Sequence, residues 1–534
     1  MFTTRPLTTL LLPLLPLLLL ALFSSSATPT PTPLSSLLFT LPPLLSPTAE
    51  IYLPLHPSQP DEQHQHLLPN PIPGGPEPPP HRWSTSPLNT PFPGVIIRAA
   101  TEADIVATIR QANAHGVPFL ATSGGHGVNR ALAGLGKEGV VIDLGKMDSF
   151  RLIPRGRAGE GRYWKGDVAV VGGGMRTGDL IDWLWAAGRE TTTGVCGCTG
   201  FAGVVLGGGH GLLQGRYGIG ADQIVGARVV LGDGEVVEVD VAREEGRDLL
   251  WGLGGAGHNF GVVSELRVKV YEVGEGRKWW AWQIFVFAGG RLEEVYGVAA
   301  RMMETQPEGV VVWSAWMMMP EIDPVKPVIA FTIFFSGSLD ESRRYTEPIS
   351  SLGPNGYGEG ETEYPGLAGV LGAGTDDQLC QPQGAAFMRG IDLDHYDLGA
   401  LRNWYNTFSE MLAANKALAG SFCMLEGYSM QGVQAVPPES KAYPHRDKKL
   451  LFAPAIFYAD ATNSSLAQEA VRWGEAMRTA AFGTAQRRTY VNYAFGDESL
   501  EAMYGYEPWR LEKLRGLKRK YDPENRFRFY APIV

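Results

Sequence analysis

Three glycine-rich segments in the first half of the chain constrain its fold more than any other feature. They span residues 123–127, 196–211 and 252–261. Glycine lets a second backbone or a ligand approach closely, because it has no Cβ atom. The first segment follows an apolar run that predicts a buried strand at residues 117–121, and the third leads into an alternating strand pattern at 262–270. We therefore expect a domain of helices and strands whose loops line a ligand.

Caps and periodicity place further elements in this domain. Thr101 predicts a helix start, because Asp104 completes a capping box and Gly116 ends the apolar stripe. Apolar runs predict strands at residues 140–144 and 168–171, and a helix at 179–187.

From Trp279 onward glycine is rarer and aromatic residues are more frequent. Alternation and helical spacing predict strands at 280–287, 310–318, 328–335, 422–428 and 450–458, with helices near 397–414 and 464–481. This order predicts an α+β fold of two domains, the second an antiparallel sheet covered by helices. A chain of 534 residues is long enough for two cores.

Several function classes lack their sequence signatures. The net charge of -10 and the absence of Lys/Arg runs mixed with aromatic residues argue against nucleic acid as a partner. Residues 252–257 match GxGxxG, but a helical pattern precedes them and a strand follows, the reverse of a Rossmann unit. The GxxxxGK[ST], HExxH and GxSxG motifs do not occur.

The N-terminus predicts secretion. A basic residue, an apolar run at residues 10–23 and small residues up to Ala27 form the pattern of a signal peptide over residues 1–27. A membrane anchor would need about 20 apolar residues, and this run is shorter and contains two prolines. Residues 28–90 are rich in Pro, Ser and Thr, so we expect much of this segment to be extended and poorly ordered. Asn463 starts a glycosylation triplet.

Four cysteines are too few for a disulfide scaffold and include no CxxC pair for a zinc site, so we expect no metal. A bridge between Cys380 and Cys423 would leave Cys196 for chemistry, with Cys198 two residues away.

Seven motifs, in this order along the chain, resemble the berberine bridge enzyme-like branch of the vanillyl-alcohol-oxidase (PCMH-type) FAD oxidoreductases, and of its members the secreted fungal ones. They are Ser-Gly-Gly-His at 123–126, Gly-Gly-Gly-His-Gly at 207–211, Asp-Leu-Leu-Trp at 248–251, Asn-Phe-Gly-Val-Val at 259–263, Tyr-Pro-His-Arg at 443–446, Tyr-Val-Asn-Tyr at 490–493 and Lys-Tyr-Asp-Pro-Glu-Asn at 520–525. The resemblance runs from about Arg82 to the C-terminus.

This resemblance implies a PCMH-type FAD-binding domain at residues 91–272, a substrate domain at 273–481 and a C-terminal segment at 482–534 that returns to the FAD domain. It implies FAD bound covalently through His126, and also through Cys196 unless Cys198 takes that role. The other cofactor-binding residues implied are Ser123, Gly124, Gly125, Gly127, Gly203, Gly207, Gly208, Gly209, Val263 and Asn492.

The expected reaction is hydride transfer from a small organic alcohol or amine to FAD and then to O₂. Family members place a base on the strand after Tyr-Pro-His-Arg, but residues 450–458 contain no carboxylate. Tyr458 and Tyr493 are therefore the candidate bases. A tyrosine would need a lowered pKa, for which Arg446 is one source of positive charge.

Thr199, three residues after Cys196, corresponds to the family position that admits or blocks oxygen beside the flavin. Its valine-like shape favours an oxidase, although its hydroxyl would be costly there if unpaired.

Two other functions remain open at this stage. A secreted carbohydrate oxidase would need a polar cleft, whereas a cluster of large apolar residues indicates an apolar wall or simply a core: Trp279, Trp280, Trp282, Trp313, Trp316 and Met317 to Met319. A non-catalytic flavin-binding surface protein is the other hypothesis, because the expected carboxylate is missing.

Overall fold

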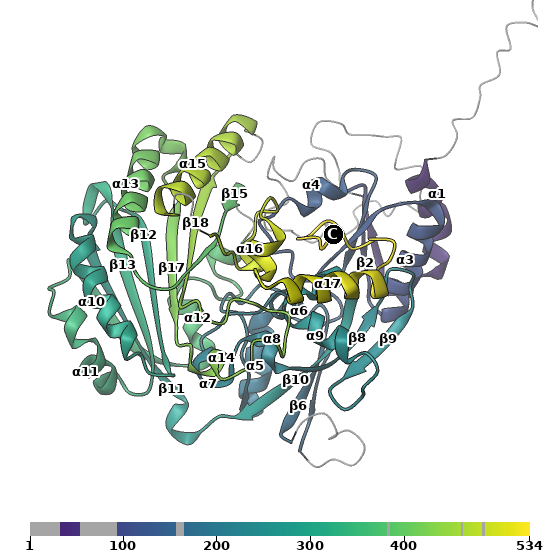
Figure 1. The fold of residues 1–534 in the computed structure, drawn as a ribbon, viewed down its shortest axis with the longest axis horizontal. Coiled ribbons are helices and arrows are strands. Elements are labelled where there is room, and N and C mark those ends of the chain that lie inside the picture. Colours follow the sequence, from purple (N-terminus) through teal and green to yellow (C-terminus); the bar gives the residue numbers. More distant parts are fainter. Residues whose placement is uncertain (1–31, 54–92, 156–164, 382–384, 461–462, 483–485) are drawn as a thin grey trace, which may run out of the picture.

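The computed structural model describes residues 32–53, 93–155, 165–381, 385–460, 463–482 and 486–534. The predicted signal segment, residues 1–27, lies outside these described residues. No helix within them is long and apolar enough to cross a membrane. Two smaller sheets and one large sheet lie side by side (Figure 1).

The first small sheet holds the strand that leads into the first glycine-rich segment. Its order is β1-β2-β4-β3, with parallel pairing of β2, β4 and β3. The strands are β1 (Glu50–Tyr52), β2 (Val95–Arg98), β3 (Phe119–Thr122) and β4 (Val140–Asp143). Helix α3 (Glu102–His115) covers this sheet and begins at the predicted capping box, in which Asp104 Oδ2 accepts from Thr101 N at 2.8 Å. Gly116, at φ 68°, ends the helix in the left-handed conformation that favours glycine.

The second small sheet is antiparallel and has the order β5-β6-β10-β8-β9, with β7 also paired to β10. Its strands are β5 (Phe150–Ile153), β6 (Asp167–Gly172), β7 (Arg189–Glu190), β8 (Ile224–Val230), β9 (Val236–Asp240) and β10 (Val262–Glu272). The helices of this domain are α4 (Ala131–Leu135), α5 (Thr177–Ala186), α6 (Phe201–Leu206), α7 (Gln214–Tyr217), α8 (Gly220–Gln223) and α9 (Arg247–Ala256). The GxGxxG match at residues 252–257 thus lies at the end of a helix, α9, and is followed by a strand, β10. A Rossmann unit has the reverse order.

The N-terminal segment differs from the expectation of an extended chain. Helix α1 (Pro33–Thr40) packs against the first sheet, and β1 pairs with β2. Four buried leucines stand at helical spacing, Leu34, Leu37, Leu38 and Leu41. Thr32 caps the helix, and Pro33 stands at its first position, where a missing N–H costs nothing. The prediction was wrong for residues 32–53 because this apolar stripe outweighs the Pro, Ser and Thr content.

The large sheet belongs to the second domain and has the order β14-β11-β13-β12-β17-β18-β15, with β16 also paired to β18. Its strands are β11 (Trp279–Ala288), β12 (Val310–Met319), β13 (Asp323–Ser336), β14 (Gly356–Glu363), β15 (Ala385–Met388), β16 (Ile391–Leu393), β17 (Phe422–Tyr428) and β18 (Leu450–Tyr458). All of its pairings are antiparallel, as predicted.

This sheet has a helix face and an inner face. Four helices cover the helix face (Figure 1): α10 (Leu292–Glu304), α11 (Leu339–Ser350), α13 (Leu398–Ala414) and α15 (Ser464–Phe482). Side chains of the inner face, such as Val311 and Leu451, belong to a cluster that includes Leu213 of the first domain. The inner face therefore meets the domain that carries the glycine-rich segments.

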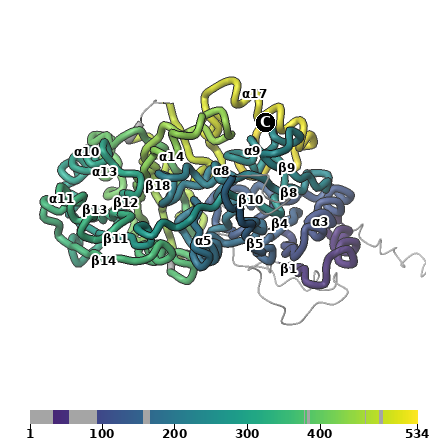
Figure 2. The backbone as a smooth tube through the Cα atoms, turned by 90° about the horizontal axis from the view of Figure 1, so that it is seen from below, coloured from purple at the N-terminus to yellow at the C-terminus, as the bar shows by residue number. Residues whose placement is uncertain are grey.

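The C-terminal residues lie against the first domain. Helix α17 (Pro508–Tyr521) runs beside α9 (Figures 1 and 2), and helix α16 (Leu500–Tyr504) packs against α17. Leu511, Leu514 and Leu517 are buried in the same core as Leu249. Asn259 Oδ1 also accepts a hydrogen bond of 2.9 Å from the backbone N–H of Ile533.

The edge of the large sheet is interrupted where this segment passes. Strand β15 pairs with residues 455–458 and β16 with residues 450–452, so neither pairs with Pro454. Proline has no N–H to donate to a ladder. Between the two short strands, Gly390 N–H donates to the carbonyl of Tyr493 at 3.2 Å. The C-terminal segment thus docks into the break.

Candidate active site

The first two glycine-rich segments touch through their backbones. A Cβ atom added to Gly124 would lie 2.3 Å from Gly200 N, so only glycine permits this approach. Ser123 Oγ donates to Gly173 O at 2.7 Å, which ties the first segment to the end of β6. Gly125 has φ 60°, and Gly127 is exposed. The backbone in this way brings the side chains of the two segments together.

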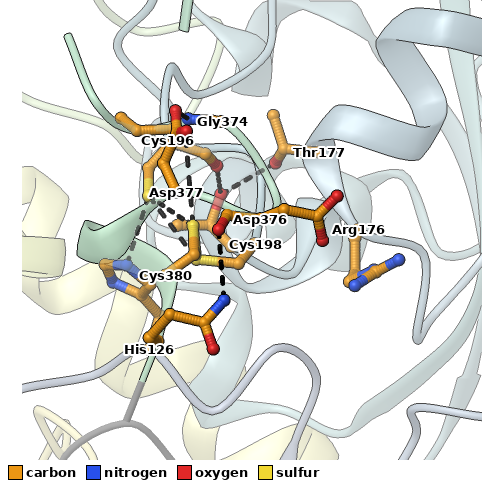
Figure 3. The surroundings of a disulfide bond; sticks show 12 residues. His126, Arg176, Thr177, Cys196, Cys198, Gly374, Asp376, Asp377 and Cys380 are labelled. Atoms are coloured by element: carbon orange, nitrogen blue, oxygen red, sulfur yellow. Dashed lines mark hydrogen bonds between the residues drawn. A yellow bond between two sulfur atoms is a disulfide. The ribbon is translucent and has the colours of Figure 1, made fainter. Parts of the chain in front are cut away.

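His126 and Cys196 meet at this junction. His126 Nε2 lies 3.5 Å from Cys196 Sγ (Figure 3), and both residues are partly exposed. Cys198 forms a disulfide with Cys380, which is carried by a loop of the second domain. The suggested bridge between Cys380 and Cys423 is therefore wrong, because Cys423 is buried in the helix-face core. Cys196 is in no disulfide.

The second glycine-rich segment packs against the C-terminal motif. Asn492 Nδ2 donates to Val204 O at 2.8 Å, and its side chain lies where a Cβ of Gly207 would stand. Gly209 N donates to Tyr490 Oη at 2.9 Å. Gly208 packs against Tyr490 as well.

Val263 and Gly203, two of the residues implied in cofactor binding, lie in different environments. The side chain of Val263, at the start of β10, is buried in the core of the first domain. A Cβ added to Gly203, on α6, would meet no atom within 4 Å. Helix α6 therefore has open space on that side.

These residues fit the FAD that the resemblance implies. An imidazole and a thiol, both partly exposed, stand together at the junction of two glycine-rich loops and the second domain. His126, Cys196 and Cys198 also offer metal-ligand atoms within 4.8 Å of one another. A thiolate is the form that binds metal, and the sulfur of Cys198 is in a disulfide. The group therefore suits a covalent cofactor better than a metal.

A buried carboxylate stands on the inner face of the large sheet. Glu426, on β17, accepts hydrogen bonds of 2.6 Å from the hydroxyls of Tyr493 and Tyr428. Burial raises the pKa of Glu426 to about 7, although both hydrogen bonds lower it. Cys196 is close enough to Tyr493 to contribute to that tyrosine's raised pKa. Tyr493 therefore hydrogen-bonds to the carboxylate and is within electrostatic range of Cys196.

The two candidate bases lie in different places. Tyr493 is beside Glu426, but burial and the Glu426 charge raise its pKa well above the ordinary value, the opposite of what a tyrosine base requires. Tyr458 is buried in the helix-face core, because alternation along β18 turns it away from Leu451 and the inner face. Arg446 pairs with Asp222 at 2.6 Å, so its charge is already matched.

The sequence places the expected base on β18, whereas the carboxylate stands on the neighbouring strand β17, as Glu426. The sequence does contain a signal. Glu426 interrupts an otherwise apolar predicted strand, and a charged residue inside a buried strand indicates a function or a partner.

The aromatic residues divide between the two faces of the sheet. Trp313 pairs with Glu426 across β12 and β17, so the two side chains share the inner face. Trp280 and Trp282 belong to the same inner-face cluster. Trp316 lies in the helix-face core instead, and Trp279 is 54% exposed. Part of the predicted apolar wall therefore borders the carboxylate.

Thr199 lies directly beside Cys196. Its hydroxyl donates to the carbonyl of Cys196 at 2.7 Å and lies 2.8 Å from Thr177 Oγ1. The hydroxyl is therefore hydrogen-bonded. Only the methyl group of Thr199 can limit access to the flavin as a valine methyl would.

Comparisons with known proteins agree with this arrangement. Residues 93–240 match the family described as FAD binding domain, and residues 489–534 match the family described as Berberine and berberine like. An FAD-linked oxidoreductase of Penicillium rubens is 36% identical over 460 residues, which cover 85% of this chain and 88% of that protein. The chain belongs to the berberine bridge enzyme-like FAD-linked oxidoreductases. It is an FAD-dependent oxidoreductase.

Two solved structures place the fold of this berberine bridge enzyme-like oxidoreductase among PCMH-type flavoproteins. BBE-like 1 of Physcomitrella patens has a TM-score of 0.72 and 20% identity, covering 94% of this chain and 99% of its own. Glucooligosaccharide oxidase from Acremonium strictum has a TM-score of 0.68 and 21% identity, covering 83% and 92%. That enzyme carries a 6-S-cysteinyl, 8α-N1-histidyl FAD.

Proposed function

We propose that this protein is an oxidase in which Glu426 removes the O–H or N–H proton of a small organic substrate. The observation that carries the proposal is the buried carboxylate with a pKa of about 7, held between Tyr428 and Tyr493 on the sheet face that meets the first domain. A base with a pKa near the working pH is the most effective proton acceptor. Bound FAD would supply the acceptor for the substrate's hydride, with O₂ as the proposed final acceptor of the electrons.

The chain's own residues divide the remaining tasks. Tyr493 and Tyr428 donate to both oxygens of Glu426, so the orientation of the carboxylate is fixed. Trp313, on the same face, excludes water and offers an apolar surface for an aromatic or aliphatic substrate. This carboxylate also argues against a non-catalytic flavin carrier, the hypothesis that depended on its absence.

We propose two covalent bonds to FAD, one from His126 and one from Cys196. The support is their 3.5 Å approach, their partial exposure and the use of Cys198 in a disulfide. The doubly linked FAD of the glucooligosaccharide oxidase, a protein of the same fold, is a precedent. Covalent bonds prevent loss of the cofactor by dilution, which suits an enzyme that works outside the cell.

Secretion is part of the proposal. Its support is the N-terminal pattern together with the Cys198–Cys380 disulfide, since disulfides persist in oxidising compartments. Asn463 caps α15 through its side-chain oxygen, which accepts from Ser465 N and Leu466 N at 3.0 Å. A glycan attaches to the amide nitrogen, so the cap and glycosylation are compatible.

Carbohydrate oxidation is the second candidate, favoured by the solved glucooligosaccharide oxidase. Anaerobic mixing of the purified protein with a panel of hydrophobic alcohols, amines and oligosaccharides separates the two. We expect hydrophobic substrates to bleach the flavin and Glu426→Gln to slow the bleaching. Bleaching by oligosaccharides alone would favour the second candidate, and no bleaching by any substrate, with photoreduction intact, would contradict both.

The covalent bonds have their own test. Acid precipitation should leave the colour with the protein in the wild type, in His126→Ala and in Cys196→Ala, and only the double variant should release it. Cys423→Ala, which changes a cysteine in the helix-face core, is the matched control. Complete release of the colour from the wild type would overturn the covalent proposal.

A further inference from the structure

Three sulfur atoms and one imidazole nitrogen are grouped at the boundary of the two domains (Figure 3). Cys196 Sγ lies 3.5 Å from Cys380 Sγ and 3.6 Å from Cys198 Sγ, the two atoms of the disulfide. It also lies 3.5 Å from His126 Nε2. A thiol in this position touches both a disulfide and a group that accepts its proton.

We propose that Cys196, Cys198 and Cys380 form a thiol–disulfide exchange site. His126 accepts the proton of the Cys196 thiol, and the Cys196 thiolate attacks Cys380 Sγ. The Cys196–Cys380 bond forms as the Cys198–Cys380 bond breaks. Cys198 leaves as a thiolate and takes the proton from His126. One disulfide and one thiol exist before and after the step, so no external oxidant or reductant is required.

Cys196 Sγ lies almost equally far from both disulfide atoms and must move into line with the S–S bond to attack. We infer attack on Cys380 from how the two sulfur atoms are held. A bond from Cys196 to Cys198 would close a tight ring through a single intervening residue. Cys380 stands on a separate loop, which the first domain holds in place: Gly197 N donates to Ala373 O at 2.8 Å. Asp377 stabilises the loop, since its Oδ2 accepts from Gly374 N at 2.7 Å and its carbonyl from Cys380 N at 2.8 Å.

Accessibility separates this group from the remaining cysteine. Cys196, Cys198 and Cys380 are all partly exposed, as exchange with each other and with small thiols requires. Cys423 is fully buried, and burial raises the pKa of its thiol well above the ordinary value. A thiol of that kind is inert, which makes Cys423 the matched control.

The exchange determines which chemistry Cys196 can perform, a consequence that rests on the proposed Cys196–flavin bond. With Cys198–Cys380 formed, the Cys196 thiol is available to the cofactor. With Cys196–Cys380 formed, that thiol is consumed and only His126 can hold the flavin. Cys198 therefore protects Cys196 by occupying Cys380.

Peptide mapping of the full-length protein tests both steps. Trypsin places Cys196 and Cys198 in the peptide of residues 190–216, separate from His126 and from Cys380. In Cys198→Ser, folded with oxidised glutathione as the oxidant, we expect a Cys196–Cys380 crosslink and a loss of flavin from this peptide by about an order of magnitude, because the glutathione disulfide is reduced as the two neighbouring thiols pair. In the double variant Cys198→Ser/Cys380→Ser the flavin should return to this peptide. Cys423→Ser should match the wild type.

The outcomes distinguish this inference from the proposed function. If Cys198→Ser keeps its flavin on this peptide and leaves Cys380 as a thiol, exchange does not occur. If the wild-type peptide carries no flavin at all, the Cys196–flavin bond is wrong whatever the disulfides do.

A second measurement needs no variant. Acid-quenched wild-type protein should contain Cys196–Cys380 crosslinks in the fraction whose Cys196 lacks flavin. Finding only Cys198–Cys380 in that fraction would overturn the exchange.

Discussion

Tyr493 donates a hydrogen bond of 2.6 Å to Glu426 Oε1, which joins the C-terminal segment to the middle of the large sheet. Burial raises the pKa of this carboxyl to about 7. Below that pH the carboxyl is protonated and cannot accept the substrate's proton, so the rate of flavin reduction should rise as pH increases through 7. Glu426→Gln should reduce this rate by about 10²–10⁴-fold, the usual contribution of a general base. Stopped-flow reduction over a pH series measures both effects, and a wild-type rate independent of pH would exclude Glu426 as the base.

The two tyrosines should tune this pKa in a known direction. Each hydroxyl donates to Glu426 and lowers its pKa. Tyr428→Phe and Tyr493→Phe should therefore move the acidic limb of the pH profile to higher pH. Tyr458→Phe, on the helix face, is the control and should leave the limb unchanged. A limb that moves to lower pH in either variant would contradict the assignment.

Thr199 should control access of oxygen to the reduced flavin. Its methyl group occupies little space beside Cys196, and its hydroxyl is paired with Cys196 O and Thr177. We expect Thr199→Leu to slow reoxidation of photoreduced protein in aerated buffer, because the larger side chain fills that space. Thr199→Val keeps the shape without the hydroxyl and should reoxidise like the wild type. Equal rates for the wild type and the leucine variant would show that Thr199 is not a gate.

The C-terminal helix should be essential for stability. Leu514 is fully buried in the core of the first domain. Leu514→Ala should lower the free energy of unfolding by about 2–5 kcal/mol, the range for a large-to-small change in a core. Glu512→Ala, an exposed position on the same helix, is the control for denaturant titration.

Truncation after Phe495 should yield no soluble flavin-loaded protein, and recovery of such a protein would show that the tail is dispensable.

The elements that the sequence predicted well are those set by local chemistry. The helix after Thr101 followed from its capping box, and β11, β12, β13, β17 and β18 of the large sheet followed from alternation. The edge strands β14, β15 and β16 were not predicted. Helix α1 differs from the expectation for a Pro-, Ser- and Thr-rich segment, because Leu34, Leu37, Leu38 and Leu41 stand at helical spacing and are buried. The Cys198–Cys380 pair spans 182 residues, and no local pattern determines a connection of that length.

The candidate site shows the same limit. The His126 loop is a local motif, whereas Glu426 and Tyr493 come from segments 67 residues apart and meet only through the tertiary fold. Alternation along β18 predicts which residues share a face with Tyr458. It does not predict which of the two faces meets the first domain, because that depends on how the domains pack.

Pro454 and Gly390 have no reactive groups, yet the break in the sheet beside Pro454 makes both important for the position of Tyr493. Gly390 holds the backbone of Tyr493 in that break, and a Cβ atom there would lie 2.6 Å from the Cβ of Tyr493. Any side chain at position 390 would displace Tyr493, the residue that holds Glu426 Oε1. In an unbiased mutational scan, Gly390 should therefore tolerate substitution as poorly as a residue that takes part in the reaction.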